Sequence, residues 1–343
     1  MPKVPAEVVA EQYQLKATFF ANGLDSRGYV GLFEFVKAAL AGSSSLLSWE
    51  KADEFGISAS ILNSIEANGL SVGQWYCHPN MLALNPRYLI YFRCIAALSQ
   101  KGLKALSGVS AVENLENGMS QCEPEQALKL AIAINENLNA IYTVQIPEPE
   151  KLKALMYATA GTTIDGSWRN KIGSEGERVV RTLFLKELLE RSELEKVISR
   201  SGEEHVAAGL SADWLDDHTA GLSSCLTSNG CVIQFGSEPD IKLVDANGRT
   251  VGGVEIKAGI DPAGALERLG AMMKSFENIR AESSEAETIL VASCITDEVQ
   301  DRLASMKNVR TYVMTDVIQN RRSKRTHLMN VMRASLGLTE GFH

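Results

Sequence analysis

The chain has 343 residues, of which 45% are hydrophobic and 22% are charged. This composition excludes a disordered chain and is ample for the core of one large domain or two smaller ones. The formal net charge of −8 argues against a uniformly basic surface that binds nucleic acid without specificity, although it leaves room for a locally basic groove.

The sequence contains neither a basic-then-apolar leader nor an apolar run of about 20 residues that could span a bilayer. We therefore expect a cytoplasmic protein. Its six cysteines are scattered and form no Cys-x-x-Cys pair, which argues against a zinc site or a disulfide framework.

Apolar periodicity in the amino-terminal half predicts a run of helices. They are expected at residues 5–22, 27–41, 88–106, 124–141 and 150–160. Pro147 and Pro149, followed by the turn-rich stretch 161–167, predict a domain boundary between about 145 and 167. We therefore expect an all-α domain over residues 1–160 and a second domain over residues 161–343.

Residues 48–69 resemble a helix-turn-helix motif. Ala52 would let two helices approach closely, Gly56 would take the unusual backbone conformation of the turn, and Ser58 would cap the second helix. In such motifs the second helix enters the major groove. Its exposed positions would be Ser58, Ser60, Asn63 and Ser64. This helix carries no Arg or Lys, so a plain helical hairpin remains open as the alternative.

A second set of candidate DNA contacts accompanies the aromatic-rich stretch from Trp75 to Phe92. The set comprises Arg87, Arg93, Lys101 and Lys104. Aromatic side chains beside arginines could contact nucleic acid. More often such a stretch is core, with the arginines at its rim.

The carboxy-terminal half alternates predicted helices and strands. A helix is expected at 172–191, where Ser174 and Glu177 have the spacing of a capping box. Its basic residues add positive charge suited to phosphates; with their neighbours they are Arg169, Lys171, Arg178 and Arg181. A later helix is expected to start with Asp261 as its N-cap and Pro262 at its first position.

The remaining elements complete a mixed sheet flanked by helices. Strands are expected at 231–236, 287–294 and 309–314, and helices at 296–306 and 315–335. The run 287–294 is continuously apolar, as expected of a strand buried on both faces. The cluster of Asp216, Asp217 and His218 could be a second metal or proton-transfer site, or a solvated acidic loop.

The most informative stretch is one predicted hairpin. An Asn-Gly pair between two alternating runs predicts strands at about 240–245 and 250–257. Asp240 then opens the first strand, and Glu255 and Lys257 project from one face near the end of the second. Two carboxylates and an amine thus converge, which suits a hard divalent cation and a lysine that orients or deprotonates a water molecule.

The residues Pro239-Asp240, fourteen intervening residues and then Glu255-Ile256-Lys257 resemble the signature of the PD-(D/E)xK nucleases, which is typical of many type II restriction endonucleases. The order of elements over about 170–320 resembles the restriction-endonuclease-like core. The resemblance implies Mg²⁺-dependent hydrolysis of phosphodiesters in double-stranded DNA. Asp240 and Glu255 would bind the metal, the Ile256 carbonyl would be a further ligand, and Lys257 would act on the water.

In these nucleases the helix before the hairpin often supplies another acidic residue near the metal. Glu175 and Glu177 match that place, and Glu175 is favoured because capping already explains Glu177. The resemblance also implies a symmetric homodimer that cuts both strands, with the helical domain contributing recognition, dimerisation or both. Further candidate DNA contacts are Arg268, Arg321 and Arg322, for which a solvated surface is the alternative.

Two other functions remain open. A DNA repair, recombination or modification-dependent nuclease would share the same core. A DNA-binding regulator would instead use the helix-turn-helix and keep an inactive nuclease domain. For the hairpin itself, the alternative is an ordinary surface hairpin that carries one ion pair.

Overall fold

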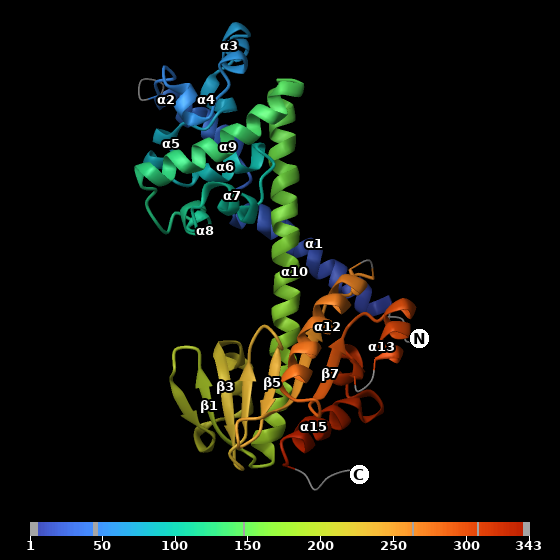
Figure 1. Ribbon diagram of the computed structural model, residues 1–343. Coiled ribbons are helices and arrows are strands. Elements are labelled where there is room, and N and C mark those ends of the chain that lie inside the picture. Colours follow the sequence, from blue (N-terminus) through green and yellow to red (C-terminus); the bar gives the residue numbers. More distant parts are fainter. Residues whose placement is uncertain (1–5, 44–46, 147, 263, 307–308, 339–343) are drawn as a thin grey trace. The chain divides into compact units, whose positions relative to one another are not determined.

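A computed structural model describes residues 6–43, 47–146, 148–262, 264–306 and 309–338 (Figure 1). The described chain forms two compact units. One is helical and covers residues 14–168; the other is an α/β unit of residues 169–338 together with residues 6–13. Within these described ranges, no helix has the length and apolar character needed to cross a membrane.

Three long helices, α1, α9 and α10, and a series of short ones make up the helical part. They are α1 (Ala6–Ser26), α2 (Leu32–Ser43), the 3-10 helix η2 (Ala52–Phe55), α3 (Ala59–Ala67), α4 (Val72–Trp75), α5 (Pro79–Leu84), α6 (Tyr88–Ile95), α7 (Gln100–Ser107), α8 (Val112–Glu116), α9 (Pro124–Val144) and α10 (Pro149–Glu190). α1, α2 and α9 confirm the helices predicted there. The helix predicted at 88–106 is instead two helices, separated at Ala97, whose φ is 54°.

Helix α9 packs against α5, α6 and α7 through an apolar stripe with a spacing of four residues. This stripe includes Leu130, Ile134 and Leu138, all fully buried. The neighbouring Asn135 is also buried, and its amide bonds to both the N–H and the carbonyl of Cys77 at 2.8 Å. A buried amide whose polar atoms all find backbone partners fixes how the surrounding loops approach the helix.

The stretch that resembles a helix-turn-helix has a shorter first element than expected. Its first helix is the four-residue 3-10 helix η2, whereas Gly56 adopts the turn conformation that was predicted, with φ 75°. Ser58 makes no side-chain cap on α3; its N–H donates to Asn139 Oδ1 at 3.1 Å, while Asn139 donates to the Gly56 carbonyl at 2.8 Å. Helix α9 therefore holds the turn. On α3, the side chains of Ser60, Asn63 and Ser64 are exposed.

His78 is a buried residue whose two ring nitrogens have different partners. Nδ1 accepts a hydrogen bond from the N–H of Asn80 at 3.1 Å, and Nε2 donates to the Ser48 carbonyl at 3.0 Å. The ring lies edge-on to Trp49 and Phe55. Burial lowers the pKa of His78, against the effect of the Ser48 carbonyl. The neutral imidazole is thus the form that fits, because a protonated Nδ1 could not accept a hydrogen bond.

Helix α10 is one continuous helix of 42 residues. The turn predicted at 161–167 and the helix start predicted near 172 are therefore wrong. The hydroxyls of Thr163, Ser167 and Ser174 donate to carbonyl oxygens four residues earlier, a bond that is compatible with a helix interior. Ser174 consequently caps nothing.

Packing of α1 explains why this part of α10 stays helical. Lys16 of α1 pairs with Asp165 of α10 at 2.6 Å, and the Ile164 side chain lies against Gly23 of α1. Tertiary contacts of this kind outweigh the low helix propensity of the glycines and threonines in the sequence.

The α/β unit is built on one sheet of eight strands in the order β2-β1-β3-β4-β5-β6-β7-β8. The strands are β1 (Leu194–Ser199), β2 (Glu204–Val206), β3 (Leu222–Thr227), β4 (Val232–Phe235), β5 (Ile241–Val244), β6 (Thr250–Lys257), β7 (Glu287–Ala292) and β8 (Val309–Val313). Pairs from β2 to β6 are antiparallel, and β6, β7 and β8 are parallel. Strands β4 to β8 confirm the mixed sheet that was predicted.

The sheet is covered on both faces. α12 (Ala265–Glu282) and α13 (Asp297–Ser305) follow β6 and β7, and α15 (Lys324–Ser335) ends the described chain. Strand β7 divides its apolar side chains between two cores, with Ile289 facing the core of α10 and α15 and Leu290 facing that of α12 and α13. This alternation confirms that β7 is buried on both faces.

Two predicted helices have different bounds. The helix expected from Pro262 begins at Ala265, with Gly264 as its N-cap. The helix expected at 315–335 is divided into α14 (Met314–Ile318), the 3-10 helix η5 (Arg321–Ser323) and α15. The division coincides with left-handed backbone at Asn320, Arg322 and Ser323, a conformation that no continuous helix contains.

Candidate active site

The predicted hairpin is present as β5 and β6. Ile241 pairs with Val254 in antiparallel register, which places Asp240 beside Glu255. In the turn, Gly248 has φ 80°, and the Asp245 carboxylate accepts hydrogen bonds from the backbone N–H groups of residues 247 and 249. The register is therefore set locally, by a turn that needs glycine at one position.

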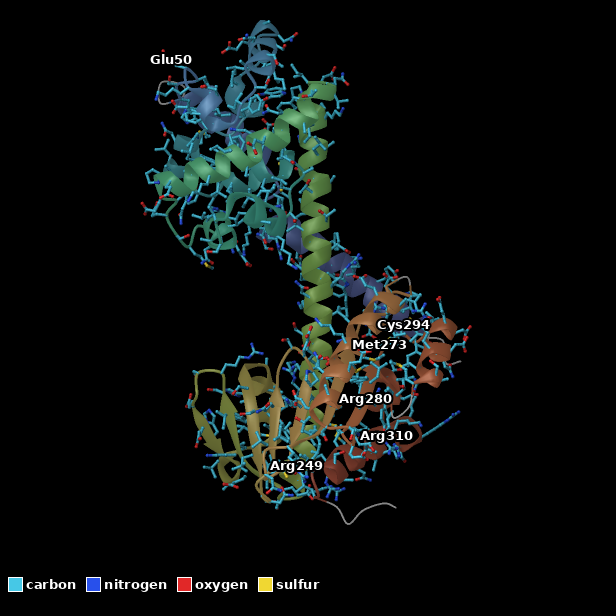
Figure 2. The ribbon with its side chains drawn as sticks, in the orientation of Figure 1. Glu50, Arg249, Met273, Arg280, Cys294 and Arg310 are labelled. Atoms are coloured by element: carbon cyan, nitrogen blue, oxygen red, sulfur yellow. The ribbon has the colours of Figure 1, made fainter. Side chains whose placement is uncertain are left out.

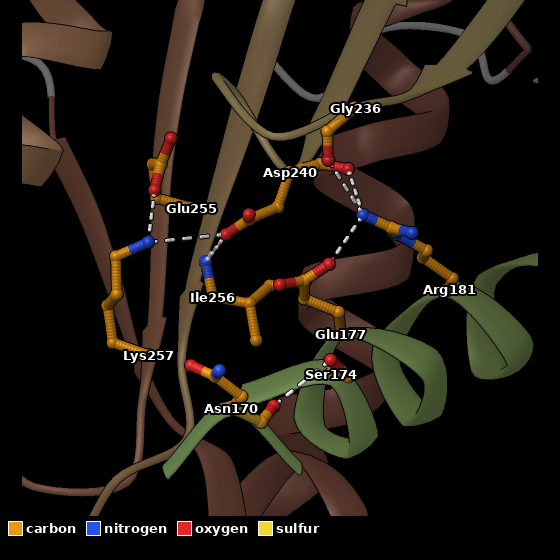
Figure 3. Close-up of polar contacts among 9 residues, drawn as sticks. All are labelled: Asn170, Ser174, Glu177, Arg181, Gly236, Asp240, Glu255, Ile256 and Lys257. Carbon is orange, nitrogen blue, oxygen red and sulfur yellow. Dashed lines mark hydrogen bonds and ion pairs between the residues drawn. The ribbon is translucent and has the colours of Figure 1, made fainter. Parts of the chain in front are cut away.

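Figure 3 shows the three predicted catalytic residues together at the end of this hairpin. Nζ of Lys257 lies 2.5 Å from Glu255 Oε2 and 3.4 Å from Asp240 Oδ2. The backbone N–H of Ile256 donates to Asp240 Oδ2 at 2.6 Å. The Asp240 carboxylate is thereby fixed by two donors from the neighbouring strand.

Both carboxylates are buried, since Asp240 is 3% and Glu255 2% exposed. Burial of two like charges is costly unless cations or donors compensate for it. Lys257 supplies one positive charge for the two. Oε1 of Glu255 is buried and has no hydrogen-bond partner among the described residues, which leaves it able to bind a cation.

The electrostatics of the three groups are coupled. Burial raises the pKa of Asp240 to about 7; Lys257 opposes this rise, and the carboxylates of Glu255 and Glu177 add to it. Burial lowers the pKa of Lys257, but Asp240 and Glu255 outweigh that effect and leave it raised. Lys257 is therefore an ammonium at neutral pH, and an additional cation nearby would favour the ionised form of Asp240.

Of the two acidic candidates on α10, Glu177 lies toward the site and Glu175 does not contact it. Both oxygens of Glu175 bind the guanidinium of Arg178, at 2.6 and 2.9 Å, on an exposed part of the helix. Glu177 faces the loop before β5, where it pairs with Arg181 at 2.8 Å (Figure 3). The capping role that had favoured Glu175 over Glu177 is absent, because both residues lie inside α10.

Arg181 connects the helix to the loop that carries Asp240. Its Nη2 lies 3.0 Å from the carbonyl oxygen of Gly236 and 2.9 Å from that of Asp240 (Figure 3). The sequence suggested only a general attraction of this residue for phosphates. The one sequence signal for its actual role is the spacing of four residues from Glu177, which permits an ion pair on one helix face.

The predicted DNA contact Arg93 requires correction. Its side chain is fully buried, its guanidinium is paired with the buried carboxylate of Glu116, and it donates to the Leu98 carbonyl at 2.8 Å. It is a core ion pair of the helical unit and cannot reach DNA in this structure. Arg87, Arg321 and Arg322 are exposed.

Arg268 lies close to the candidate active site. It lines a small cavity together with Lys257, Leu269, Met272 and Cys294, and it donates to the Asp261 carbonyl at 2.5 Å. Another arginine of the α/β unit, Arg310, forms an ion pair at the surface. Arg310, labelled in Figure 2, pairs with Glu287 at 3.0 Å.

The acidic cluster at the end of α11 (Ala212–His218) is held by ion pairs and ring stacking. Asp216 pairs with Lys186 at 2.7 Å, and the ring of His218 stacks on Trp214 with centroids 4.2 Å apart. No set of three or more His, Cys, Asp or Glu side chains suited to a metal ion occurs in the described part of the chain. Its cysteines are all free.

A mixed sheet flanked by helices, with two buried carboxylates and a lysine at the end of its central hairpin, defines the restriction-endonuclease-like class of fold. The family model described as XcyI restriction endonuclease matches residues 47–339, and the chain belongs to this family. The match spans both units. Membership is consistent with the general activity of a type II restriction endonuclease, whose substrate is DNA. A search of curated proteins finds no match.

Proposed function

We propose that the chain is a Mg²⁺-dependent endonuclease that cuts double-stranded DNA at a specific sequence, with Asp240, Glu255 and Lys257 as its catalytic residues. The observation that carries the proposal is the contact of one lysine with two buried carboxylates at the end of β6. A structural ion pair needs one carboxylate. Here there are two, and Oε1 of Glu255 has no hydrogen-bond partner within the described part of the chain, which suits a divalent cation.

The donor set fits Mg²⁺. This ion commonly takes one or two protein carboxylates and completes its shell with water and substrate phosphate. Asp240 and Glu255 would hold it, with the Ile256 carbonyl as a further oxygen ligand. When bound, Mg²⁺ would stabilise negative charge on the attacking and leaving oxygens of the phosphodiester.

The residues of the chain would contribute orientation and charge. Lys257 is an ammonium in this arrangement, so it would orient the attacking water and offset the charge that develops on the phosphate. It could accept a proton from that water only after losing one of its own protons, which neutralisation of Asp240 and Glu255 would favour by lowering its pKa. The N–H of Ile256 would keep the Asp240 carboxylate in place at 2.6 Å.

The helical unit would take part in recognition and in assembly of a homodimer. The family match begins at residue 47 and therefore includes most of this unit. A symmetric dimer would place two identical sites on the two strands of a palindrome. Sedimentation equilibrium on the full chain tests this directly, and a monomer at the concentrations that cut DNA would contradict it.

A cleavage assay tests the proposed function. The protein is incubated with phage DNA in Mg²⁺ or in EDTA, and the products are separated on a gel. Discrete bands that require Mg²⁺ support site-specific cleavage. A smear would instead indicate a non-specific nuclease, and a mobility shift without cutting would indicate a DNA-binding regulator.

Isosteric variants connect the activity to the site. Asp240→Asn and Glu255→Gln should each abolish the bands, because they remove the charge and keep the shape. Glu195→Gln is the matched control: Glu195 is an exposed carboxylate on strand β1 of the same sheet, so its variant should cut like the wild type. Retained cutting by both Asp240→Asn and Glu255→Gln would refute the assignment.

A further inference from the structure

Arg181 makes an unusual set of contacts for a buried arginine. It is 4% exposed, and its single nitrogen Nη2 lies within hydrogen-bond distance of three oxygens. These are Oε2 of Glu177 at 2.8 Å and the carbonyls of Gly236 and Asp240 at 3.0 and 2.9 Å. The guanidinium also lies 5.4 Å from the centroid of the Phe235 ring. The Arg181 side chain therefore contacts Glu177 on its own helix, Phe235 at the end of β4, and the residues at both ends of the loop that follows β4.

The two carbonyls belong to the loop that joins β4 to β5. Gly236 is the first residue of this loop and Asp240 the last, so one guanidinium ties together the two ends from which the loop departs. The contact to Asp240 is with its backbone and not with its carboxylate. The carboxylate instead faces Ile256 and Lys257. Arg181 therefore fixes the backbone from which the carboxylate projects.

The same guanidinium also orients the Glu177 side chain. The Glu177 side chain is 29% exposed. Its Oε2 is bound to Nη2 of Arg181, and Nη2 makes no hydrogen bond to its other oxygen, Oε1. Figure 3 shows Glu177 between Arg181 and the Asp240 side of the hairpin. Arg181 thus contacts two carboxyl-bearing residues from different parts of the chain: Glu177 on its own helix, and Asp240, which lies 59 residues after Arg181 in the sequence.

We propose that Arg181 is a positioning residue of the nuclease site, which holds Asp240 and Glu177 in the one arrangement that accepts the divalent cation. This role rests on the proposed function, since it presupposes that Asp240 binds a metal. Arg181 touches no reacting atom. Loss of its contacts should therefore weaken metal binding and leave the affinity for DNA unchanged. Loss of a residue that orients metal ligands typically lowers metal affinity or activity by about 10- to 100-fold.

The test uses Arg181→Met, which keeps a long side chain over Phe235 and removes the charge and the donors. The matched control is Arg333→Met. Arg333 is likewise buried and pairs with a glutamate, Glu193, but it lies on α15 and contacts none of the proposed catalytic residues. Both variants should lose stability. Only Arg181→Met should change the metal requirement.

Three quantities are measured on the full-length proteins: the shift of the thermal unfolding midpoint on addition of Mg²⁺, the Mn²⁺ affinity by calorimetry, and DNA affinity by anisotropy in EDTA. For Arg181→Met we expect metal affinity to fall by about 10-fold or more, with DNA affinity unchanged. Excess Mg²⁺ should then restore part of the cleavage activity. Should Arg181→Met fail to fold, Arg181→Lys carries the test, with a smaller loss, because an ammonium keeps the charge without the planar fork.

The outcomes separate this role from the proposed function. If Arg181→Met binds metal as tightly as the wild type and Arg333→Met do, the positioning role of Arg181 is overturned and the proposed function is left standing. A wild-type protein whose midpoint and calorimetric signal do not respond to metal would overturn the metal site itself, and the role of Arg181 with it.

Discussion

Replacement of Lys257 by alanine is the most direct perturbation of the site. Nζ of Lys257 lies 2.5 Å from Glu255 and 3.4 Å from Asp240, whose side chains are only 3% and 5% exposed. Removal of one partner from a buried ion pair costs about 3–5 kcal/mol. We expect a cost near the lower value, because 23% of the Lys257 side chain is exposed and Asp240 can take up a proton.

The catalytic effect of the same change should exceed its structural effect. Loss of a group that stabilises developing charge lowers the rate by about 10²–10³, and loss of proton transfer by about 10²–10⁴. Lys257→Ala should therefore reduce cleavage by at least about 10²-fold. DNA binding should change little, since most affinity comes from the many phosphate contacts outside this site.

The assay is single-turnover cleavage of a labelled fragment that contains one mapped site, at saturating enzyme and well below the unfolding midpoint of the variant. Binding is measured separately by anisotropy in Ca²⁺. Lys257→Met keeps the alkyl chain beside Leu269 and Met272 and separates charge from packing. Lys242→Ala is the control, because Lys242 lies on the same hairpin, on β5, and its ammonium pairs with Glu282 at 2.6 Å. Wild-type cleavage by Lys257→Ala would refute the reasoning.

Three further predictions concern other parts of the chain. Arg93→Met strands the buried Glu116 carboxylate, so the free energy of unfolding should fall by about 3–5 kcal/mol in urea titrations; a negligible change would contradict the core ion pair. Because burial lowers the pKa of His78 below 6.5, the folded state binds fewer protons than the unfolded chain, and stability should decline as the pH falls below about 6.5. His78→Asn should flatten this decline in thermal unfolding, and an unaltered pH profile would argue against it. If Arg321 and Arg322 each contact a phosphate, replacing both by alanine should reduce the slope of log affinity against log salt by about 1.8; an unchanged slope would assign them to a solvated surface.

Local sequence determined the hairpin, and the sequence therefore predicted it well. Gly248 supplies the backbone conformation of the turn, and the alternation on either side sets which side chains share a face. The same is true of Gly56, whose φ of 75° the sequence anticipated. Such features depend on residues a few positions apart, so a single sequence contains all the information that they need.

Features that depend on distant residues were not predictable in this way. Arg93 resembled a surface arginine because its partner Glu116 lies 23 positions away. Helix α10 resembled two helices with a turn between them, because the contacts with α1 that stabilise its middle come from residues more than 100 positions earlier in the sequence. Strands β1, β2 and β3 are short, and their apolar residues alternate only weakly. Their sequences alone therefore did not predict strands, because these segments are stabilised by pairing with one another in the sheet.

The continuity of α10 has a practical consequence for dissecting this protein. A helix of 42 residues is about 63 Å long, and the division between the two units at residues 168 and 169 falls inside it. The other passage of the chain between the units, at residues 13 and 14, falls inside α1. Both points at which the chain crosses between the units therefore lie within helices, and a protease could cleave there only after local unwinding of the helix. A fragment that starts at Arg169 would begin in mid-helix and would lack residues 6–13, so the activities of the two units are better separated by point substitution than by truncation.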